Sequence, residues 1–435
     1  MSWGHAVSKD MLRWKHLELA LPEEEGIMMY SGSAVIDWNN TSGFGKNGEP
    51  PMVAIYTGHT ATHQQQAIAY SNDKGRTWTK YSGNPVIPSK RKHFRDPKVL
   101  WHEDTQSWIM IVVLADERKA RFYGSPDLKE WTLLSTFGPE GAFPVRNWEC
   151  PDLFELPVEN LSGQSRWVFQ VDSGDGHPAG GSGCQYFVGD FDGKRFVSEN
   201  PGENTMWVDH GADFYAAQTW SDVPESDGRR LMLAWMNNWS YARQVPTNPW
   251  RGAQSLAREV SLRAFDEGIR LKQKPIREID SLRGQHVTAR GVSVAEANAK
   301  VESLKGETLE IKVELELSEA AEVGMEVRVG GDEKTRVGYT QATEQVWVDR
   351  TESGKVDFNE NFSGVHSARL KPANGRVRLH VIVDASSVEV FANDGRVALT
   401  DRIFPSSNSR GWSLFGEDAK VVRLDAWKLK SAWTD

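Results

Sequence analysis

The amino-acid sequence predicts an all-β protein, made of a five-bladed β-propeller followed by a β-sandwich. Three observations support this prediction. An aspartate turn motif recurs along the first half of the chain, a short apolar segment lies near most of its copies, and apolar and charged residues alternate beyond about residue 270. Patterns typical of helices are nearly absent. We expect the propeller to span residues 1–272 and the sandwich residues 286–435.

The repeated turn motif places an aspartate a few residues before an aromatic side chain. The aspartates are separated by 63, 54 and 63 residues, which is long enough for one four-stranded propeller blade and its loops. We expect each motif to form the turn of a hairpin, with the aromatic side chain returning into the blade. The four aspartates are Asp10, Asp73, Asp127 and Asp190.

Four short apolar segments are predicted to be buried strands, because continuous apolar runs bounded by polar turns are typical of them. They are residues 53–56, 108–114, 167–171 and 231–236. The first three precede a turn motif by roughly fifteen to twenty residues, as blade geometry requires. The first motif has only a few residues ahead of it. We therefore expect the first blade to lack its inner strands in this chain.

The second domain is predicted from a change of pattern. Between residues 309 and 317 every second residue is apolar and the residues between them are charged, which is typical of a half-buried antiparallel strand. Residues 377–383 show a similar alternation. Residues 388–391 precede Asn-Asp-Gly at 393–395, a strong hairpin signal. The boundary between the domains is expected near Lys272–Pro275.

Composition narrows the class of partner. The chain has 435 residues, of which 39% are apolar and 26% charged, and its formal net charge is −9. A negative balance argues against nucleic acid or an anionic membrane surface, because both attract basic faces. No apolar run approaches the ~20 residues that span a bilayer. We expect neither a nucleic-acid nor a membrane partner.

Metal and cofactor sites are not indicated. The two cysteines, Cys150 and Cys184, lack the spacing of a zinc site and do not form a disulfide framework. His59 and His63 are four residues apart, but no helical period or acidic pattern surrounds them, so a polar loop is the better interpretation. We expect no metal and no cofactor. The oligomeric state is left open.

Two carboxylates are candidates for acid–base chemistry, because they lie among aromatic residues and prolines that suggest a cleft. Glu149 follows Trp148, and burial beside an indole would disfavour its charged form, so it is the candidate general acid. Asp96 follows Arg95 and is expected to stay ionised. The alternatives are a paired structural carboxylate for Glu149 and a structural ion pair for Arg95 and Asp96.

Five motifs in order resemble the signature of glycoside hydrolase family 32, and the likeness runs from Trp3-Gly-His5 to Ile403-Phe-Pro405. The resemblance implies a β-fructosidase of the levanase, inulinase and invertase type. Its substrate would be a small-molecule or polysaccharide β-fructoside. The motifs are Tyr-Ser-Gly-Ser-Ala-Val at 30–35, Phe-Arg-Asp-Pro-Lys at 94–98, Trp-Glu-Cys-Pro-Asp-Leu-Phe at 148–154, Asp-Phe-Tyr-Ala at 213–216 and Trp-Met-Asn-Asn-Trp at 235–239.

The resemblance also implies residue roles. Glu149 would be the acid/base, and Asp96 would bind fructose hydroxyls and stabilise the oxocarbenium-like transition state. The fructose pocket would be lined by Tyr30, Ser31, Arg95, Tyr215 and Trp235. For Tyr215 and Trp235, the alternative is ordinary packing in the core of a blade.

One departure from the family pattern concerns the nucleophile. In the family it is the Asp of a Trp-Met-Asn-Asp-Pro-Asn-Gly segment, expected about thirty residues before Trp3, and this sequence contains no such segment. Residues 235–238 have Asn where the carboxylate is needed, and Asp37 matches a different family position. A retaining glycosidase needs its nucleophile about 5–5.5 Å from the acid. We therefore expect an N-terminally truncated, nearly inactive form of an exo-acting retaining enzyme.

Two other functions stay open. A non-catalytic fructan-binding protein or degenerate enzyme would keep the sugar-binding residues without cleaving the sugar. A related five-bladed arabinofuranosidase also uses two Asp and one Glu, but the Trp-Glu-Cys-Pro-Asp motif and the sandwich domain argue against it. An extracellular location is favoured if a signal peptide lies upstream, and a cytoplasmic one otherwise.

Overall fold

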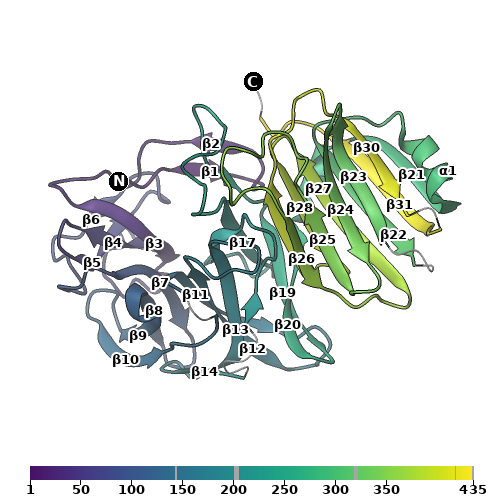
Figure 1. The fold of residues 1–435 in the computed structure, drawn as a ribbon. Coiled ribbons are helices and arrows are strands. Elements are labelled where there is room, and N and C mark those ends of the chain that lie inside the picture. The colour runs from purple at the N-terminus through teal and green to yellow at the C-terminus, as the bar shows by residue number, and fades with distance from the viewer. Residues whose placement is uncertain (143–144, 200–204, 318–321, 417, 434–435) are drawn as a thin grey trace. The chain divides into compact units, whose positions relative to one another are not determined.

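The computed structural model describes residues 1–142, 145–199, 205–317, 322–416 and 418–433. Within these ranges the chain is built almost entirely of β-strands, with a single α-helix, as the sequence predicts (Figure 1). It divides into two compact units. The first comprises Met1–Asp175, Cys184–Met206 and Ala216–Met232, and the second comprises Gly176–Gly183, Trp207–Tyr215 and Leu233–Asp435.

The first unit contains successive antiparallel sheets, each made of strands that follow one another along the chain. This meander order is that of propeller blades. A short hairpin, β1 (Ala6–Ser8) and β2 (Trp14–His16), comes first. The sheets are β3 (Met28–Ile36), β4 (Met52–His59), β5 (Gln64–Ser71), β6 (Thr79–Lys80); β7 (Phe94–His102), β8 (Ser107–Leu114), β9 (Lys119–Ser125), β10 (Thr132–Phe137); and β11 (Trp148–Pro157), β12 (Ser165–Ser173), β13 (Gly183–Phe191), β14 (Phe196–Ser198). The 3-10 helix η1 (Ala115–Glu117) joins β8 to β9.

Three of the repeated aspartates lie in hairpin turns, as predicted. Asp73 lies between β5 and β6, and its carboxylate accepts hydrogen bonds from the backbone N–H groups of Arg76 (3.0 Å) and Thr77 (2.9 Å). Asp10 and Asp127 accept equivalent backbone hydrogen bonds in the β1–β2 and β9–β10 turns. A side-chain oxygen thus satisfies backbone donors that the turn would leave unpaired.

The fourth motif differs in which aspartate forms the turn. Asp190 is still paired with Val197 in the ladder between β13 and β14. Asp192 takes the turn position instead, and its carboxylate accepts hydrogen bonds from the backbone N–H groups of Lys194 (2.8 Å) and Arg195 (2.7 Å). The predicted turn residue is therefore wrong by two positions, because the strand pairing continues past Asp190.

The first strands of successive sheets are neighbours. The hydroxyl of Ser33 in β3 donates to the carbonyl of Pro97 in β7 (3.1 Å) and accepts from the backbone N–H of Val99 (3.1 Å). Strand β7 in turn packs against β11. Side-by-side first strands are the arrangement of a β-propeller, as predicted for the fold class, whereas the number of blades stays a prediction.

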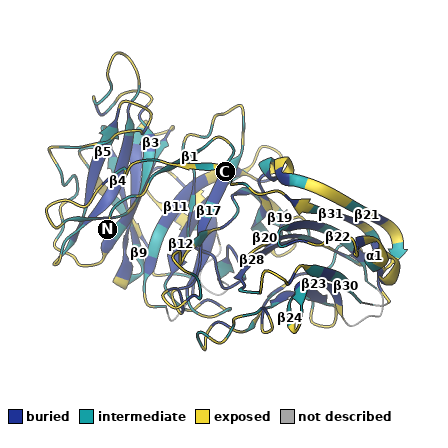
Figure 2. Ribbon diagram, turned by 90° about the horizontal axis from the view of Figure 1, so that it is seen from above, coloured by how far each residue is buried: buried dark blue, intermediate teal, exposed yellow. Residues whose placement is uncertain are grey.

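The core of the first unit explains the continuous apolar segments. Strands β4 and β8 are buried along almost their whole length, because neighbouring sheets cover both of their faces, and Figure 2 shows β4 in dark blue. Between β8 and β12, for example, Ile111, Phe122 and Phe169 belong to one apolar cluster. The predicted strands at 53–56, 108–114 and 167–171 are confirmed.

The chain passes between the two units within β16 (Tyr215–Thr219) and β17 (Arg230–Met236), which confirms the predicted strand at 231–236. In the second unit, β19 (Arg258–Phe265) pairs with β20 (Gly268–Pro275) along its whole length. A 3-10 helix, η2 (Arg277–Leu282), follows. Two further short strands are β15 (Met206–Trp207) and β18 (Ala253–Gln254).

The remainder of the second unit is a β-sandwich, as predicted. Its two sheets, visible as two layers in Figure 1, enclose one apolar core that includes Leu309, Ile311, Met325 and Val327. The first sheet is β21 (Arg283–Ser293), β31 (Lys420–Leu429), β22 (Leu309–Glu316), β27 (Arg376–Asp384), β28 (Ser387–Ala392), β29 (Val397–Arg402), and the second is β26 (Val365–Arg369), β25 (Gln345–Asp349), β24 (Glu333–Thr340), β23 (Glu322–Gly330), β30 (Gly411–Phe415).

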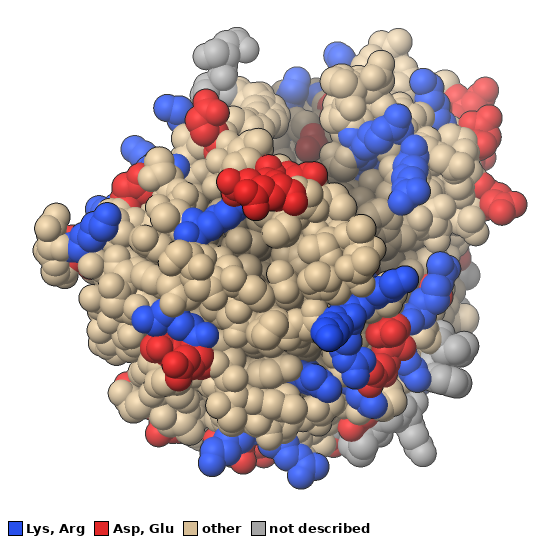
Figure 3. Space-filling view, turned by 90° about the vertical axis from the view of Figure 1, so that its left-hand side faces the viewer, with Lys and Arg blue, Asp and Glu red and all other residues tan. Residues whose placement is uncertain are grey.

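One helix, α1 (Val294–Val301), accompanies the sandwich. It begins with a capping box, in which Ser293 accepts from the backbone N–H of Glu296 and the Glu296 side chain accepts from the backbone N–H of Ser293. No helix in the described ranges is long and apolar enough to cross a membrane. On the face in Figure 3, basic and acidic side chains lie in small mixed groups, without a broad basic area.

Candidate active site

Three innermost strands of the first unit share a kink near their first residues. The backbone φ angle is 63° at Asp96 in β7, 48° at Cys150 in β11 and 53° at Ala216 in β16. Positive φ is uncommon for residues other than glycine. The ladder register also shifts between Arg95 and Lys98. Such bulges redirect side chains out of the regular alternation of a strand.

Hydrogen bonds from neighbouring strands hold these kinks. The backbone N–H of Asp96 donates to the hydroxyl of Thr57 in β4 (2.9 Å). The backbone N–H of Cys150 donates to the Asp96 carboxylate (3.0 Å), and the side-chain amide of Gln218 donates to the Cys150 carbonyl (3.1 Å). The kinked positions are therefore linked from β4 through β7 and β11 to β16.

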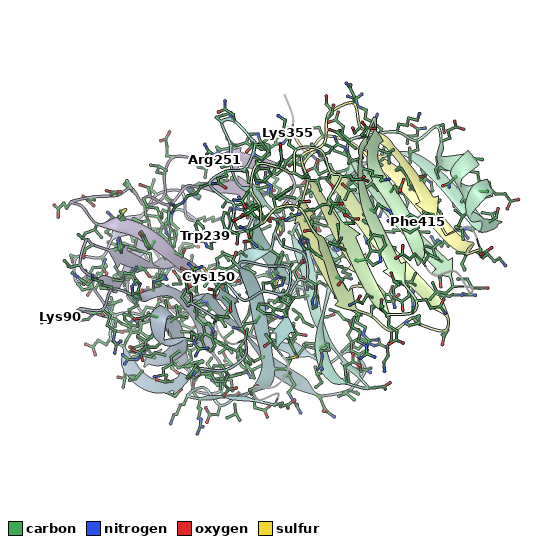
Figure 4. The ribbon with its side chains drawn as sticks, in the orientation of Figure 1. Lys90, Cys150, Trp239, Arg251, Lys355 and Phe415 are labelled. Carbon is green, nitrogen blue, oxygen red and sulfur yellow. The ribbon has the colours of Figure 1, made fainter. Side chains whose placement is uncertain are left out.

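The linkage brings three of the sequence-predicted residues together. Arg95 donates to one carboxylate oxygen of Glu149 through Nη2 (2.9 Å) and Nε (3.2 Å). Its Nε lies 3.8 Å from Oδ2 of Asp96. The arginine thus lies between two carboxylates that are 53 residues apart in the sequence. Figure 4 labels Cys150, which follows Glu149 at the start of β11.

The adjacent Arg95 suggests a lowered pKa for Asp96, but the pKa of this carboxyl is raised. Burial and the nearby negative charge of Glu149 raise the pKa of Asp96 to about 6, although Arg95 and the Cys150 N–H act to lower it. Burial also opposes the charge of Arg95, but the attraction of the two carboxylates outweighs burial and raises the pKa of Arg95. Arg95 hydrogen-bonds Glu149 and Gln64 and lies 3.8 Å from Asp96, so it lowers the pKa of Asp96 less than burial and Glu149 raise it.

The expected contact between Glu149 and the Trp148 indole is wrong. Trp148 is completely buried and packs against Phe137 and Phe169 in the apolar core, whereas Glu149 is directed to Arg95. Successive side chains of a strand point to opposite faces, so the two residues cannot share an environment. The neighbour of Glu149 in the ladder is Asp172 of β12, which is fully buried.

A cavity of about 290 Å³ opens at these strand ends. Ser31 and Asp96 are the sequence-predicted residues among its lining. The other lining side chains are not among the site residues predicted from the sequence. Trp3 lies in the Trp-Gly-His segment that carries the family resemblance, and Gln218 lies two residues beyond the Ala216 kink. The lining consists of Trp3, Ser31, Gly32, Asp96, Pro97, Cys150, Ala216 and Gln218.

The remaining predicted pocket residues are aromatic. Tyr30 stacks on His59 with ring centroids 4.3 Å apart, and its carbonyl accepts a hydrogen bond from the Trp3 indole (2.8 Å). In the second unit, Tyr215 is buried and lies edge-on to Trp235 with centroids 6.3 Å apart. Arg95, Asp96 and Glu149 are therefore directly linked, and Tyr215 and Trp235 form a separate pair.

Two domain models of one protein family match most of the chain. Residues 1–275 match the N-terminal domain of glycosyl hydrolases family 32, and residues 278–428 match the C-terminal domain of the same family. The chain belongs to glycosyl hydrolase family 32. This result confirms the resemblance inferred from the motifs.

Among the described residues, no group of three or more His, Cys, Asp or Glu side chains could hold a metal ion.

Individual family 32 proteins are similar over the full chain. A levanase of Bacillus subtilis is 50% identical over all of this chain and 65% of its own length. A levanase of a Bacillus strain is 41% identical, with 49% of its length covered. The chain thus spans about half to two thirds of these relatives. A crystal structure of exo-inulinase from Aspergillus awamori superposes with a TM-score of 0.91 at 36% identity, covering 99% of this chain and 90% of that one.

Other residues of the family 32 motifs have structural contacts. The ammonium group of Lys98 lies 3.2 Å from the carboxylate of Asp152 and donates to the Thr219 carbonyl (2.6 Å). The same carboxylate accepts from the backbone N–H (2.6 Å) and hydroxyl (2.8 Å) of Thr219. This buried group ties β7, β11 and β16 together below the cavity, so that the kinked segments are held in place.

The side chains at the two positions compared with the family nucleophile are hydrogen-bonded to backbone groups of loops. The carboxylate of Asp37 accepts from the backbone N–H groups of Thr41 (2.9 Å) and Ser42 (2.8 Å). The amide of Asn238 donates to the Ala212 carbonyl (2.8 Å) and accepts from the backbone N–H of Ser240 (2.9 Å). Both side chains therefore organise loops.

Proposed function

We propose that this family 32 chain binds the terminal fructose of a β-fructoside such as levan, inulin or sucrose, and that its family reaction is hydrolysis with retention. Glu149 is the acid/base, and Asp96 holds fructose hydroxyls. The observation that supports this most directly is the Arg95 bridge between the two carboxylates beside the cavity. Exo-inulinase and levanase are the names of similar family members, which favours fructans as substrates.

The cavity dimensions suit one sugar ring. A volume of about 290 Å³ is close to the lower limit of the range for small-molecule sites, about 300–1,000 Å³. Its lining combines an indole from Trp3 with polar groups of Ser31, Asp96 and Gln218. Such a mixture fits a ligand that is apolar on its ring face and carries hydroxyls at its edge. Tyr30, Tyr215 and Trp235 are proposed as further contacts to the sugar.

The double-displacement reaction needs a second carboxylate that attacks the anomeric carbon. We assign that role to none of the aspartates in this sequence. Hydrolysis by this chain is then expected to be slower than by a complete catalytic pair by several orders of magnitude, as when a catalytic group is removed. Binding of fructose requires no nucleophile and is retained.

An azide experiment tests this assignment. In the substrate phenyl β-fructofuranoside, azide bonds to the anomeric carbon as the bond from that carbon to the phenolic oxygen breaks, and Glu149 gives its proton to the departing oxygen. We expect little fructose release without azide and fructosyl azide with it. Glu149→Gln should abolish the azide product but keep fructose binding in calorimetry. Glu130→Gln, on the exposed β9–β10 turn, is the matched control.

A non-catalytic fructan-binding protein is the second candidate, because the linked side chains of Arg95, Asp96 and Glu149 can hold fructose without cleaving it. It predicts the same fructose binding but no azide product. Failure to bind fructose, or binding that Asp96→Asn leaves unchanged, would contradict both candidates.

A further inference from the structure

A second cavity of about 450 Å³ lies at the other end of the same inner strands. The first cavity is lined by Ser31 and Asp96, near the starts of β3 and β7, whereas Ile36 and Trp101 line the second, near the ends of those strands. Ile36 lies five residues after Ser31 in β3, and Trp101 lies five residues after Asp96 in β7. Five residues of extended strand correspond to about 16 Å. The second cavity is therefore distinct from the candidate active site.

An exposed tryptophan forms part of this cavity and is held in one orientation. Trp38 is 64% exposed. Its indole N–H donates to one carboxylate oxygen of Asp222 (2.8 Å), and the other oxygen accepts from the backbone N–H of Ile36 (3.0 Å). Asp222 itself has a positive φ of 55°. The loop thus fixes a large apolar ring at the surface, where a free side chain would be mobile.

Two more indoles complete the aromatic part of the cavity. Trp101 and Trp108 pack edge-on with centroids 5.1 Å apart. The indole N–H of Trp101 donates to Glu103 (2.7 Å), and that of Trp108 donates to Thr41 (2.8 Å). Trp108 is buried in the apolar core and supports Trp101, which is partly exposed. Because the N–H group of Trp101 is paired within the protein, a ligand meets the apolar part of that ring.

The polar groups of the lining carry both signs of charge. Glu103, Asp222, Arg230 and Asn39 belong to the lining. The carboxylates of Glu103 and Asp222 accept from the indoles of Trp101 and Trp38, and the guanidinium of Arg230 donates to the Trp220 carbonyl (3.0 Å). A mixed set of donors and acceptors does not select an anion or a cation, but it suits the hydroxyl groups of a neutral ligand. Flat apolar rings beside such groups match a carbohydrate chain.

We propose that this second cavity binds sugar units of a fructan chain at a distance from the active site. The proposal rests on the proposed function, because the occupant is the same polymer. Its larger volume accommodates more than one sugar ring. Trp38 supplies the ring on which a sugar packs, and Asp222 positions Trp38. The site would increase the affinity for long chains without changing the affinity for free fructose.

Calorimetry with an inulin-type oligosaccharide of about ten units, and separately with fructose, tests the proposal. We expect Trp38→Ala to weaken oligosaccharide binding about tenfold or more, since a truncated aromatic anchor typically costs this much, and to leave fructose binding unchanged. Asp222→Ala should weaken oligosaccharide binding in the same direction. Trp433→Ala, at a position that is 74% exposed, is the matched control. Circular dichroism verifies that each variant is folded.

The outcomes separate this inference from the proposed function. Asp96→Ala should remove fructose binding while the oligosaccharide still binds through the second cavity. If fructose binds through Asp96 but Trp38→Ala and Asp222→Ala leave the oligosaccharide affinity unchanged, the second site is refuted and the proposed function stands. If fructose does not bind to the unaltered chain, the proposed function fails.

Discussion

The buried carboxyl of Asp96 allows a quantitative test of the site's electrostatics. Its pKa is raised from 3.8 to about 6 by burial and by the charge of Glu149. The folded protein therefore holds this proton more tightly than the unfolded chain, and ionisation between these two pH values costs folding free energy. A pKa shift of about two units corresponds to about 3 kcal/mol of folding free energy. This stabilisation by the protonated Asp96 carboxyl is present below pH 4 and is lost as the pH rises through 6.

Asp96→Asn removes this titration and keeps a side-chain oxygen that can accept from the Cys150 N–H. Relative to the unaltered chain, the variant should gain stability by about 3 kcal/mol between pH 4 and pH 7, or roughly 6–12 °C in melting temperature. Thermal denaturation followed by tryptophan fluorescence across this range measures the difference. Any constant effect of the amide cancels in the pH dependence.

Asp10→Asn is the control, and its pH dependence of stability is expected to have the opposite sign. The pKa of Asp10 is lowered to about 2, because hydrogen bonds from the backbone N–H groups of Arg13 and Leu12 outweigh burial. Asp10→Asn should therefore lose stability relative to the unaltered chain at pH 7 and less so as the pH falls below 4. A difference for Asp96→Asn that is constant with pH, or that favours the variant more at low pH, would refute the reasoning.

Three further changes test other parts of the structure. Arg95→Lys removes the two-point contact with Glu149, so fructose affinity in calorimetry should fall, whereas an unchanged affinity would contradict the bridge. Arg350→Met leaves the buried carboxylate of Asp213 without its 2.6 Å partner and should lower the unfolding free energy in urea by about 3–5 kcal/mol. Gly211→Ala should prevent stable folding, since its Cβ would lie 2.2 Å from a backbone oxygen, whereas Gly4→Ala, with open space around it, should be neutral in circular dichroism.

Much of the fold could be predicted because strands and turns are local in sequence. The apolar segment at 108–114 became β8, and Asp73 and Asp127 formed turns, because a carboxylate two or three residues before a backbone N–H can accept from it in any hairpin. The helix α1 was missed, although Ser293 and Glu296 carry its capping signal. Eight residues within a strand-rich region are a weak helix pattern.

The candidate site was predicted less completely, because its geometry depends on backbone kinks that the sequence does not mark. Asp96, Cys150 and Ala216 adopt positive φ although none is glycine, and cysteine and alanine are not residue types enriched there. Strand alternation alone could have placed Trp148 and Glu149 on opposite faces. It could not have shown that Arg95 would contact Glu149, since that contact depends on how two strands meet.

The buried ion pair of Lys98 and Asp152 explains why the kinks persist. A buried charge pair contributes little net stability, since removing two ions from water costs several kcal/mol per ion. The ion pair instead positions the strands, because it joins β7 to β11 and, through Thr219, to β16. Each of the three joined residues lies two or three residues beyond the kink of its strand. Displacement of β7 or β11 would leave a buried charge unpaired, and displacement of β16 would remove the hydrogen bonds of Thr219 to both charges. The strand ends beside this anchor can therefore carry the irregular backbone at Asp96, Cys150 and Ala216, which line the first cavity.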